Sequence, residues 1–320
     1  MKKDMSKQKK LIVLTGPTAV GKTALSIRLA KEIGGEIISA DSMQVYRHMD
    51  IGSAKITEAE MQGVPHYLVD ILDPMEEFNV FLFQKLAKEA MERIYQNGHI
   101  PIIVGGTGFY IQAVLYDIDF TLNETDQTYR TELEALAKGK GAEYLHELLK
   151  ESDPEAAEQI HANNVKRVIR ALEYHRLTGE KISEHNRTER EKESPYDFCY
   201  FVLNDERSRL YERIEKRVDQ MLANGLVEEV KALKEMGCGM EQISMQGLGY
   251  KEILGYLDGA CDLEQAVYLI KRDTRHFAKR QLTWFRRERD VIFIDKPSFD
   301  YDDEKILSFM KEKMNAPKQK

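Results

Sequence analysis

Residues 16–23 read GPTAVGKT and match G-x-x-x-x-G-K-[ST], the pattern of a phosphate-binding P-loop. The apolar run 11–14 precedes this octet, and an amphipathic helical pattern follows it, as a strand-loop-helix unit requires. In such a loop, backbone N–H groups and the helix N-terminus face the phosphate oxygens. We therefore expect a polyphosphate group to bind here.

The pattern leaves the phosphate-bearing ligand open, because ATP and any organic diphosphate satisfy the same donors. We expect Lys22 to reach the terminal phosphates and the Thr23 hydroxyl to lie on a Mg²⁺ ion. The alternative is a glycine-rich turn with an exposed lysine. The complete octet in its strand-loop-helix setting argues against that alternative.

Length and charge limit the remaining possibilities. The chain has 320 residues, of which 47 are basic and 54 acidic, and its net charge is −7. It is longer than one average domain, and any contact with nucleic acid must come from a local basic patch. No apolar run approaches the roughly 20 residues of a membrane span, and residues 1–10 lack the apolar core of a secretory signal. We expect a cytoplasmic protein without a membrane segment.

The cysteines point to packing and not to a disulfide or metal framework. Cys199, Cys238 and Cys261 are odd in number, widely spaced and outside any C-x-x-C pattern. We therefore expect neither a disulfide network nor a zinc site.

The first hundred residues alternate apolar runs with helical patterns, which is typical of a parallel sheet covered by helices. Strands are predicted at 11–14, 36–40, 66–72 and 101–104, and helices at 22–33 and 80–97. Ligands in open α/β sheets bind beyond the carboxyl ends of the strands. We therefore expect three segments to converge on one pocket, namely residues 16–23, 41–47 and 105–110.

The second and third of these segments indicate a function less specifically than the P-loop does. Asp41 follows a predicted strand, and the sequence allows three roles for it: a carboxylate linked to Mg²⁺, a general base, or a residue that only caps a turn. The run Gly-Gly-Thr-Gly at 105–108 lets backbone approach a ligand, and Thr107 offers a hydroxyl. Its alternative is an ordinary strand-to-helix turn.

The remaining chain predicts an inserted module and a return to the sheet. A charged helical region at 121–194 interrupts the pattern, with Asp153-Pro154-Glu155 as a helix start. Strands resume at 198–203 and 291–294, separated by long helical patterns at 206–236 and 263–289. The fold class is therefore α/β, a P-loop parallel-sheet core (1–120 and 195–320) with an inserted all-helical domain (121–194). A polar tail after Met314 is expected to be disordered.

Two basic stretches stand out in this acidic chain. Residues 271–290 contain eight Lys or Arg against three acids, with Phe277 and Trp284 among them, and residues 166–190 contain seven against four. Arginines interleaved with aromatics are suited to contacts with RNA loops. A solvated helix face is the alternative for either stretch.

Six motifs in order resemble the bacterial tRNA dimethylallyltransferases over nearly the whole chain. They are GPTAVGKT (16–23), DSMQVYR (41–47), GGTGFY (105–110), IHANNVKRVIRALE (160–173), QGLGYKE (246–252) and TRHFAKRQLTWFR (274–286). The departures are Phe109, where the family usually has leucine, and Asn164, where it usually has aspartate.

The resemblance implies that the P-loop holds dimethylallyl diphosphate, with Mg²⁺, and that a flipped adenine of a tRNA anticodon stem-loop is the acceptor. Asp41 would be the base, and Thr107 would act at the channel mouth. The implied diphosphate-binding residues are Gly16, Thr18, Ala19, Val20, Gly21, Lys22 and Thr23, and Thr23 is the implied metal ligand. The implied tRNA-binding residues are Asp41, Ser42, Met43, Gln44, Thr107, Arg130, Lys166, Arg167, Arg170, Arg280 and Arg286.

Other functions remain open from the residues alone. A P-loop kinase of small molecules or nucleotides would share the sheet and the lysine. An RNA-binding protein with a nucleotide switch and an enzyme that prenylates free adenine nucleotides are further alternatives. The long basic carboxyl-terminal half favours tRNA over a free nucleotide. A monomer is expected.

Overall fold

The computed structural model describes residues 8–120 and 127–316, and the chain divides into two compact units. The first, called the core unit, comprises Met1–Val114 and Tyr196–Lys320. The second, called the insertion, comprises Leu115–Pro195.

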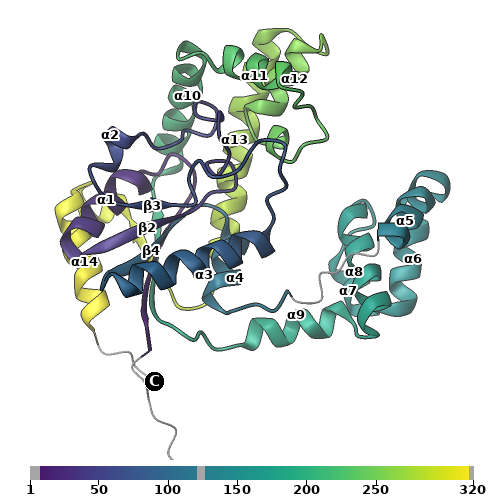
Figure 1. The fold of residues 1–320 in the computed structure, drawn as a ribbon, viewed down its shortest axis with the longest axis horizontal. Coiled ribbons are helices and arrows are strands. Elements are labelled where there is room, and N and C mark those ends of the chain that lie inside the picture. Colours follow the sequence, from purple (N-terminus) through teal and green to yellow (C-terminus); the bar gives the residue numbers. More distant parts are fainter. Residues whose placement is uncertain (1–7, 121–126, 317–320) are drawn as a thin grey trace, which may run out of the picture. The chain divides into compact units, whose positions relative to one another are not determined.

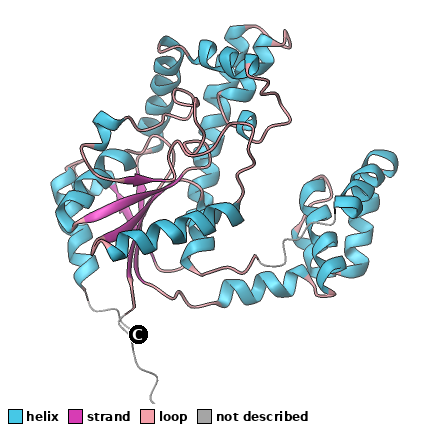
Figure 2. Ribbon diagram, in the orientation of Figure 1, coloured by secondary structure: helices cyan, strands magenta, loops and turns pink. Residues whose placement is uncertain are grey.

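The core unit is built on one parallel sheet, whose strands are magenta in Figure 2. The sheet has six strands in the order β3-β2-β4-β1-β5-β6. Because parallel strands must be joined by crossovers, helices cover both faces of such a sheet. The α/β class predicted from the sequence is confirmed. The strands are β1 (Lys10–Thr15), β2 (Gly35–Ala40), β3 (His66–Tyr67), β4 (Ile100–Gly105), β5 (Asp197–Asn204) and β6 (Val291–Asp295).

The helices of the core unit lie against both faces of this sheet and beyond its carboxyl end (Figure 1). Buried Ile12 and Leu14 alternate along β1 and share one apolar cluster with residues of α1 and α14. The α-helices are α1 (Lys22–Ile33), α2 (Glu58–Met61), α3 (Val80–Gln96), α4 (Gly108–Leu115), α10 (Arg207–Ala223), α11 (Leu226–Glu235), α12 (Tyr250–Leu257), α13 (Leu263–Phe285) and α14 (Asp303–Asn315). Two 3₁₀ turns are η1 (Ser244–Gln246) and η2 (Lys296–Phe299).

Strand register brings the three predicted segments to one edge of the sheet. Gly105 at the end of β4 pairs with Thr15 of β1 on one side and with Ala40 of β2 on the other. The P-loop, the Asp41 segment and the Gly-Gly-Thr-Gly turn therefore leave three neighbouring strands at the same level. The predicted adjacency of these segments is confirmed.

Two predicted elements are wrong in extent. The strand predicted at 66–72 ends at Tyr67, because Leu68 (φ 62°) and Asp70 (φ 60°) have left-handed backbone that cannot continue a strand. The helical pattern 206–236 is two helices. Helix α10 ends at Ala223, and Gly225, whose φ of 99° is left-handed, is the residue before α11 begins.

Helices alone form the described part of the insertion, which has its own apolar cluster around buried Leu133, Leu145 and Leu149. The predicted start at Asp153-Pro154 is confirmed, because Asp153 Oδ1 accepts a hydrogen bond from Ala156 N at 3.0 Å and caps α7. The helices are α5 (Gln127–Lys140), α6 (Ala142–Ser152), α7 (Pro154–Gln159), α8 (Val165–Thr178) and α9 (Ile182–Glu191).

The predicted carboxyl-terminal tail lies mostly outside the described residues. Helix α14 continues to Asn315, and the rest of the tail that was expected to be disordered, residues 317–320, lies outside the described residues. In the described ranges, no helix combines the length and the apolar character needed to cross a membrane.

Candidate functional site

The P-loop joins β1 to α1 in a backbone conformation suited to an anion. Ala19 (φ 64°) and Gly21 (φ 100°) both have left-handed backbone, which turns successive N–H groups toward one side of the loop. Helix α1 begins without a side-chain cap and without an acidic residue in its first turn. Its N-terminal N–H groups and dipole therefore face no competing carboxylate from the helix itself.

Lys22 is folded back over this loop. Its Nζ donates to Gly16 O at 3.0 Å and to Pro17 O at 2.9 Å. Burial, followed by the nearby charge of Arg217, lowers the pKa of Lys22 to about 7, although Asp41 opposes the shift. An anion bound in the loop would compensate this poorly solvated ammonium group.

Further cations from distant parts of the chain gather at the same loop, and none of them belongs to a sequence motif. A Cβ atom on Gly21 would lie 3.4 Å from Lys296 Nζ and 3.5 Å from Arg213 Nη2. Burial and the neighbouring Arg213 lower the pKa of Arg217, while Asp41 raises it. Like charges held together in this way repel one another unless an anion lies between them.

A sequence signal for these arginines exists. Arg209, Arg213 and Arg217 are four residues apart along α10 and so share one helix face. Over residues 205–219, five acids, Glu212 and Glu215 among them, balance five Lys or Arg residues, so the local net charge is zero. A count of charges therefore hides a row that the helical spacing would have indicated.

Gln281 of α13 ties the P-loop to the glycine-rich turn. Its Oε1 accepts a hydrogen bond from Thr18 N at 2.9 Å, and its Nε2 donates to Gly106 O at 3.0 Å. The side chain is buried, with 6% of its surface exposed. It fixes two of the three converging segments relative to each other, and no motif indicated this role.

The glycine-rich turn makes room for protein side chains. A Cβ on Gly106 would lie 2.1 Å from Gln281 Nε2, and one on Gly108 would lie 2.2 Å from Trp284 Cδ1. The packing of α13 therefore accounts for glycine at positions 106 and 108, and the expectation that these glycines bring backbone close to a ligand stays a prediction. Thr107 N donates to Ala40 O at 3.2 Å, and the Thr107 hydroxyl bonds to no described residue.

Asp41 follows β2 and forms a turn. Its Oδ1 accepts a hydrogen bond from Met43 N at 2.9 Å, so the turn-cap interpretation is correct for that oxygen. The other oxygen, Oδ2, accepts no hydrogen bond from any residue that the structure describes. The half-buried carboxylate thus keeps one oxygen for another partner, which leaves the role of base open to it.

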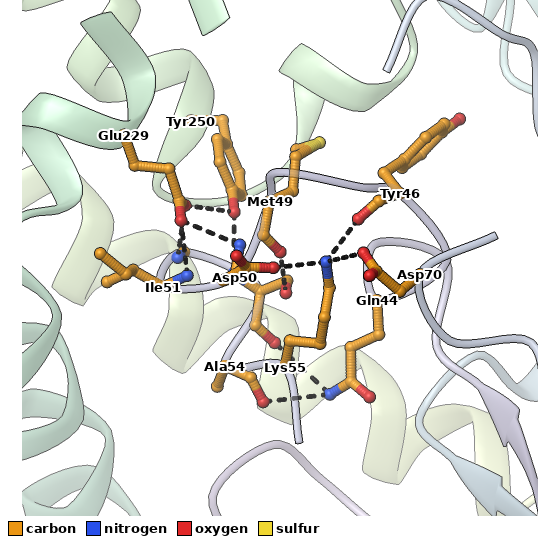
Figure 3. A network of polar contacts seen from close by, with 12 residues as sticks. Gln44, Tyr46, Met49, Asp50, Ile51, Ala54, Lys55, Asp70, Glu229 and Tyr250 are labelled. Carbon is orange, nitrogen blue, oxygen red and sulfur yellow. Dashed lines mark hydrogen bonds and ion pairs between the residues drawn. The ribbon is translucent and has the colours of Figure 1, made fainter. Parts of the chain in front are cut away.

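The Asp41 segment packs on the QGLGYKE motif of the carboxyl-terminal half. A Cβ on Gly247 would lie 2.5 Å from Met43 Sδ, so any larger residue there would displace the Met43 side chain. Gln44 Nε2 donates to Ala54 O at 3.2 Å, which fixes the orientation of the Gln44 amide (Figure 3). Met43 therefore packs against Gly247, and Gln44 is bonded to Ala54. The Ser42 hydroxyl bonds to no described residue.

The basic stretch of α13 divides into two parts. Lys271 pairs with Asp219 at 2.6 Å and Arg275 with Glu215 at 2.5 Å, so these cations hold α13 against α10. The second part is exposed and forms no ion pair with a described residue; it comprises Lys279, Arg280, Arg286 and Arg287. Arg287 lies 5.4 Å from the centre of the Trp284 ring. This second part, called the α13 cation patch, is available to a polyanion.

In the insertion, the predicted contact residues differ in exposure. Arg130 forms a two-pronged pair with buried Glu173, with both donor-acceptor distances at 2.8 Å. Arg170 is half-buried, and burial lowers its pKa. Lys166 and Arg167 are exposed. Among the predicted contact residues of the insertion, therefore, Arg130 stabilises α5 against α8, and Lys166 and Arg167 are the exposed cations.

A metal ion would have few protein ligands at the P-loop. Across the described ranges, no group of three or more His, Cys, Asp or Glu residues is placed to hold one. Thr23 is exposed at the start of α1, and its hydroxyl is an oxygen ligand of the kind that Mg²⁺ accepts. The residues present fit Mg²⁺ as an ion held mostly by the oxygens of a bound diphosphate.

Comparisons with known proteins agree with one another. The sequence profile named IPP transferase matches residues 44–288. A tRNA dimethylallyltransferase of Lachnoclostridium phytofermentans is 66% identical over 292 residues, which cover 91% of this chain and 93% of the relative. The solved tRNA isopentenylpyrophosphate transferase of Bacillus halodurans has a TM-score of 0.72 at 46% identity, covering 96% of this chain and 97% of that chain. A solved eukaryotic dimethylallyltransferase acting on tRNA has a TM-score of 0.83 at 30% identity, covering 98% of this chain and 81% of that chain.

Proposed function

This chain belongs to the IPP transferase family, and on that premise we propose that it is a tRNA dimethylallyltransferase. It transfers a dimethylallyl group from dimethylallyl diphosphate to the exocyclic N6 of the adenine on the 3′ side of the anticodon. The relatives are named for this type of transfer, which favours it over the phosphoryl transfer of a P-loop kinase.

The cations at the P-loop are the observation that carries the donor side. Lys22, Arg217 and Arg213 meet Lys296 beside an uncapped helix N-terminus. As the bond between the allylic carbon and the diphosphate oxygen breaks, negative charge grows on the departing pyrophosphate. Donors fixed in place beforehand stabilise that charge more than the ground state and so lower the barrier.

Mg²⁺, coordinated through the Thr23 hydroxyl, would add charge neutralisation for the diphosphate. The residues of the loop have two further tasks. Backbone N–H groups from residues 16–23 orient the diphosphate, and the Thr18 to Gln281 hydrogen bond keeps the loop closed against the turn at Gly106.

The acceptor side is assigned to the Asp41 segment. The lone pair of the adenine N6 is delocalised into the ring, so a base that accepts its proton during attack raises the rate. The N6 lone pair forms the new bond to the allylic carbon, the carbon–oxygen bond electrons leave with pyrophosphate, and one N6 proton passes to Asp41 Oδ2. Ser42, Met43 and Gln44 hold the adenine, and the free hydroxyl of Thr107 contacts the same ligands.

The tRNA must deliver a base that is normally stacked in its loop. Extruding the base costs a few kcal/mol, which contacts elsewhere on the anticodon stem-loop must offset. Arg280 and Arg286 in the α13 cation patch supply such contacts, together with Lys166, Arg167 and Arg170 of the insertion. Arg130 contributes to tRNA binding in our proposal although Glu173 already holds its guanidinium group.

One assay separates this function from the kinase alternative. The protein is incubated with an anticodon stem-loop and radiolabelled dimethylallyl diphosphate, and in parallel with γ-labelled ATP and a panel of nucleotides and metabolites. We expect label in the RNA and release of pyrophosphate from the allylic donor alone. Transfer of phosphate from ATP without prenyl transfer would overturn the proposal.

A further inference from the structure

Three consecutive backbone N–H groups bind the carboxylate of Glu229 like a ligand (Figure 3). Asp50 N and Ile51 N donate to Oε2 at 2.9 and 2.8 Å, and Gly52 N donates to Oε1 at 3.0 Å. Successive N–H groups that converge in this way form an anion-binding concavity. Glu229 belongs to α11, far along the chain, so its carboxylate is an anion supplied by another element of the core unit.

Tyr250, the first residue of α12, completes this arrangement. Its hydroxyl donates to Glu229 Oε1 at 2.8 Å and accepts a hydrogen bond from Ser53 N at 3.1 Å. The ring is fully buried, and a Cβ on Gly52 would lie 2.6 Å from its atoms. Residues 50–53 thus donate four consecutive N–H groups to the side chains of Glu229 and Tyr250. Only glycine at position 52 lets the backbone lie this close to the Tyr250 ring.

Residues 49–55, called the clamped loop, in turn hold the Asp41 segment. The carbonyl of Ala54 accepts from Gln44 Nε2 at 3.2 Å. Lys55 Nζ donates to Tyr46 O at 2.6 Å and pairs with Asp50 at 2.5 Å and Asp70 at 2.8 Å. The Lys55 side chain is 7% exposed, whereas its partners Asp50 and Asp70 are 65% and 56% exposed, so only the lysine end of these pairs is shielded from water. Movement of the clamped loop would therefore move Gln44 and the backbone at Tyr46.

We propose that Glu229 is a positioning residue for prenyl transfer, which holds the acceptor segment in place by occupying the anion-binding backbone of the clamped loop. The inference rests on the proposed function. It assigns to α11 and α12 the task of fixing the geometry between the acceptor base and Asp41, while the P-loop binds the donor independently. Loss of the carboxylate leaves N–H groups unpaired and frees the loop.

Glu228 offers a matched control for the test. It is exposed, lies in the same first turn of α11 and bonds to no described residue. Removing either carboxylate changes the helix-dipole interaction to a similar extent, so the difference between the two variants isolates the clamp. Tyr250→Phe is a milder second variant, because it removes one hydroxyl and keeps the ring.

The first measurement does not depend on the proposed function. Hydrogen exchange of the amides at 50–53 is compared in wild type, Glu229→Ala and Glu228→Ala, with thermal melts of all three. We expect faster exchange in Glu229→Ala alone, and an intermediate increase in Tyr250→Phe. Unchanged exchange in a folded Glu229→Ala protein would overturn the clamp. If Glu229→Ala does not fold, Tyr250→Phe decides the question by the same criterion.

The second measurement is kinetic. Since a displacement of about 1 Å at a reacting centre can cost about 10²-fold in rate, we expect kcat with the stem-loop to fall by about that factor in Glu229→Ala. The dissociation constant for dimethylallyl diphosphate should stay within about twofold, because the P-loop is held by other contacts. Added formate, which can occupy the vacated N–H groups, should restore part of kcat in Glu229→Ala and have no effect on Glu228→Ala.

Two outcomes would overturn the positioning role. One is wild-type kcat in the Glu229→Ala protein. The other is an equal loss of donor affinity and kcat without rescue by formate, which would indicate general structural damage. Failure of the wild-type protein to prenylate the stem-loop would instead refute the proposed function, and the exchange data would still test the clamp.

Discussion

Lys22 allows a quantitative prediction about how the donor's diphosphate binds. In the free protein, burial and the charge of Arg217 lower its pKa to about 7 against the opposing effect of Asp41. A bound diphosphate brings negative charge to the ammonium group, which raises that pKa in the complex. Binding must therefore take up a proton at any pH where Lys22 is partly neutral in the free protein.

The expected size of this uptake follows from the pKa. At pH 8, about nine-tenths of free Lys22 is neutral, so binding takes up about 0.9 proton at this group. At pH 6 the group is already charged, and the uptake falls to about 0.1 proton. The affinity for the diphosphate should accordingly weaken by up to about tenfold per pH unit as the pH rises above 7. It weakens with rising pH because only protonated Lys22 pairs with the anion.

Isothermal titration calorimetry with inorganic pyrophosphate measures this uptake directly. Titrations at pH 6 and pH 8 in buffers of different ionisation enthalpy give the number of protons bound. Lys22→Arg is the control, because its guanidinium stays charged and pyrophosphate's own protonation is common to both proteins. Equal proton uptake by wild type and Lys22→Arg at pH 8 would refute the argument.

Three further predictions concern the other parts of the site. Asp41→Asn should keep the affinities for donor and stem-loop but lose on the order of 10² to 10⁴ in single-turnover rate, and a wild-type rate would remove Asp41 as base. Replacing both Arg280 and Arg286 with Ala should reduce the steepness with which log affinity for the stem-loop falls with log salt, by about 0.7 per lost phosphate contact. The control Lys85→Ala, at an exposed position of α3, should leave this slope unchanged. Gln281→Leu should lower thermal stability and weaken pyrophosphate binding, since it leaves two partners unpaired at about 1–3 kcal/mol each; unchanged pyrophosphate affinity would show that the hydrogen bond to Thr18 does not shape the loop.

The fold was predictable where local pattern and global fold agree. The P-loop, β1 and α1 appear where the sequence places them, because the strand, glycines and amphipathic helix each favour the same structure. The third strand was overestimated, since its apolar pattern continues past Leu68 while the backbone there turns left-handed. That turn depends on tertiary contacts such as Arg47 N to Leu72 O at 2.8 Å, which a local pattern cannot indicate.

The site was predictable only where its residues are adjacent in sequence. The octet at 16–23 and the turn of Asp41 are local features, and both are present. Arg217 and Gln281 reach the same loop from helices about 200 residues or more away in sequence. Only the four-residue spacing of Arg217 from Arg213 and Arg209 marks it, and Gln281 has no such signal. Their contribution depends on how α10 and α13 pack, which net-charge counts and motif spacing do not encode.

Helix α13 physically connects the two substrates of the proposed reaction. Its buried face places Gln281 on the P-loop and Trp284 on Gly108, while its exposed face carries the α13 cation patch. The proposed contacts of tRNA phosphates with Arg280 or Arg286 would therefore act on the same element that holds Thr18. Because packed elements shift as units, we expect tRNA binding in the proposed reaction to be coupled to the donor loop through Gln281. The coupling must be reciprocal, so a bound diphosphate that steadies the P-loop should also favour the arrangement of α13 that meets the RNA.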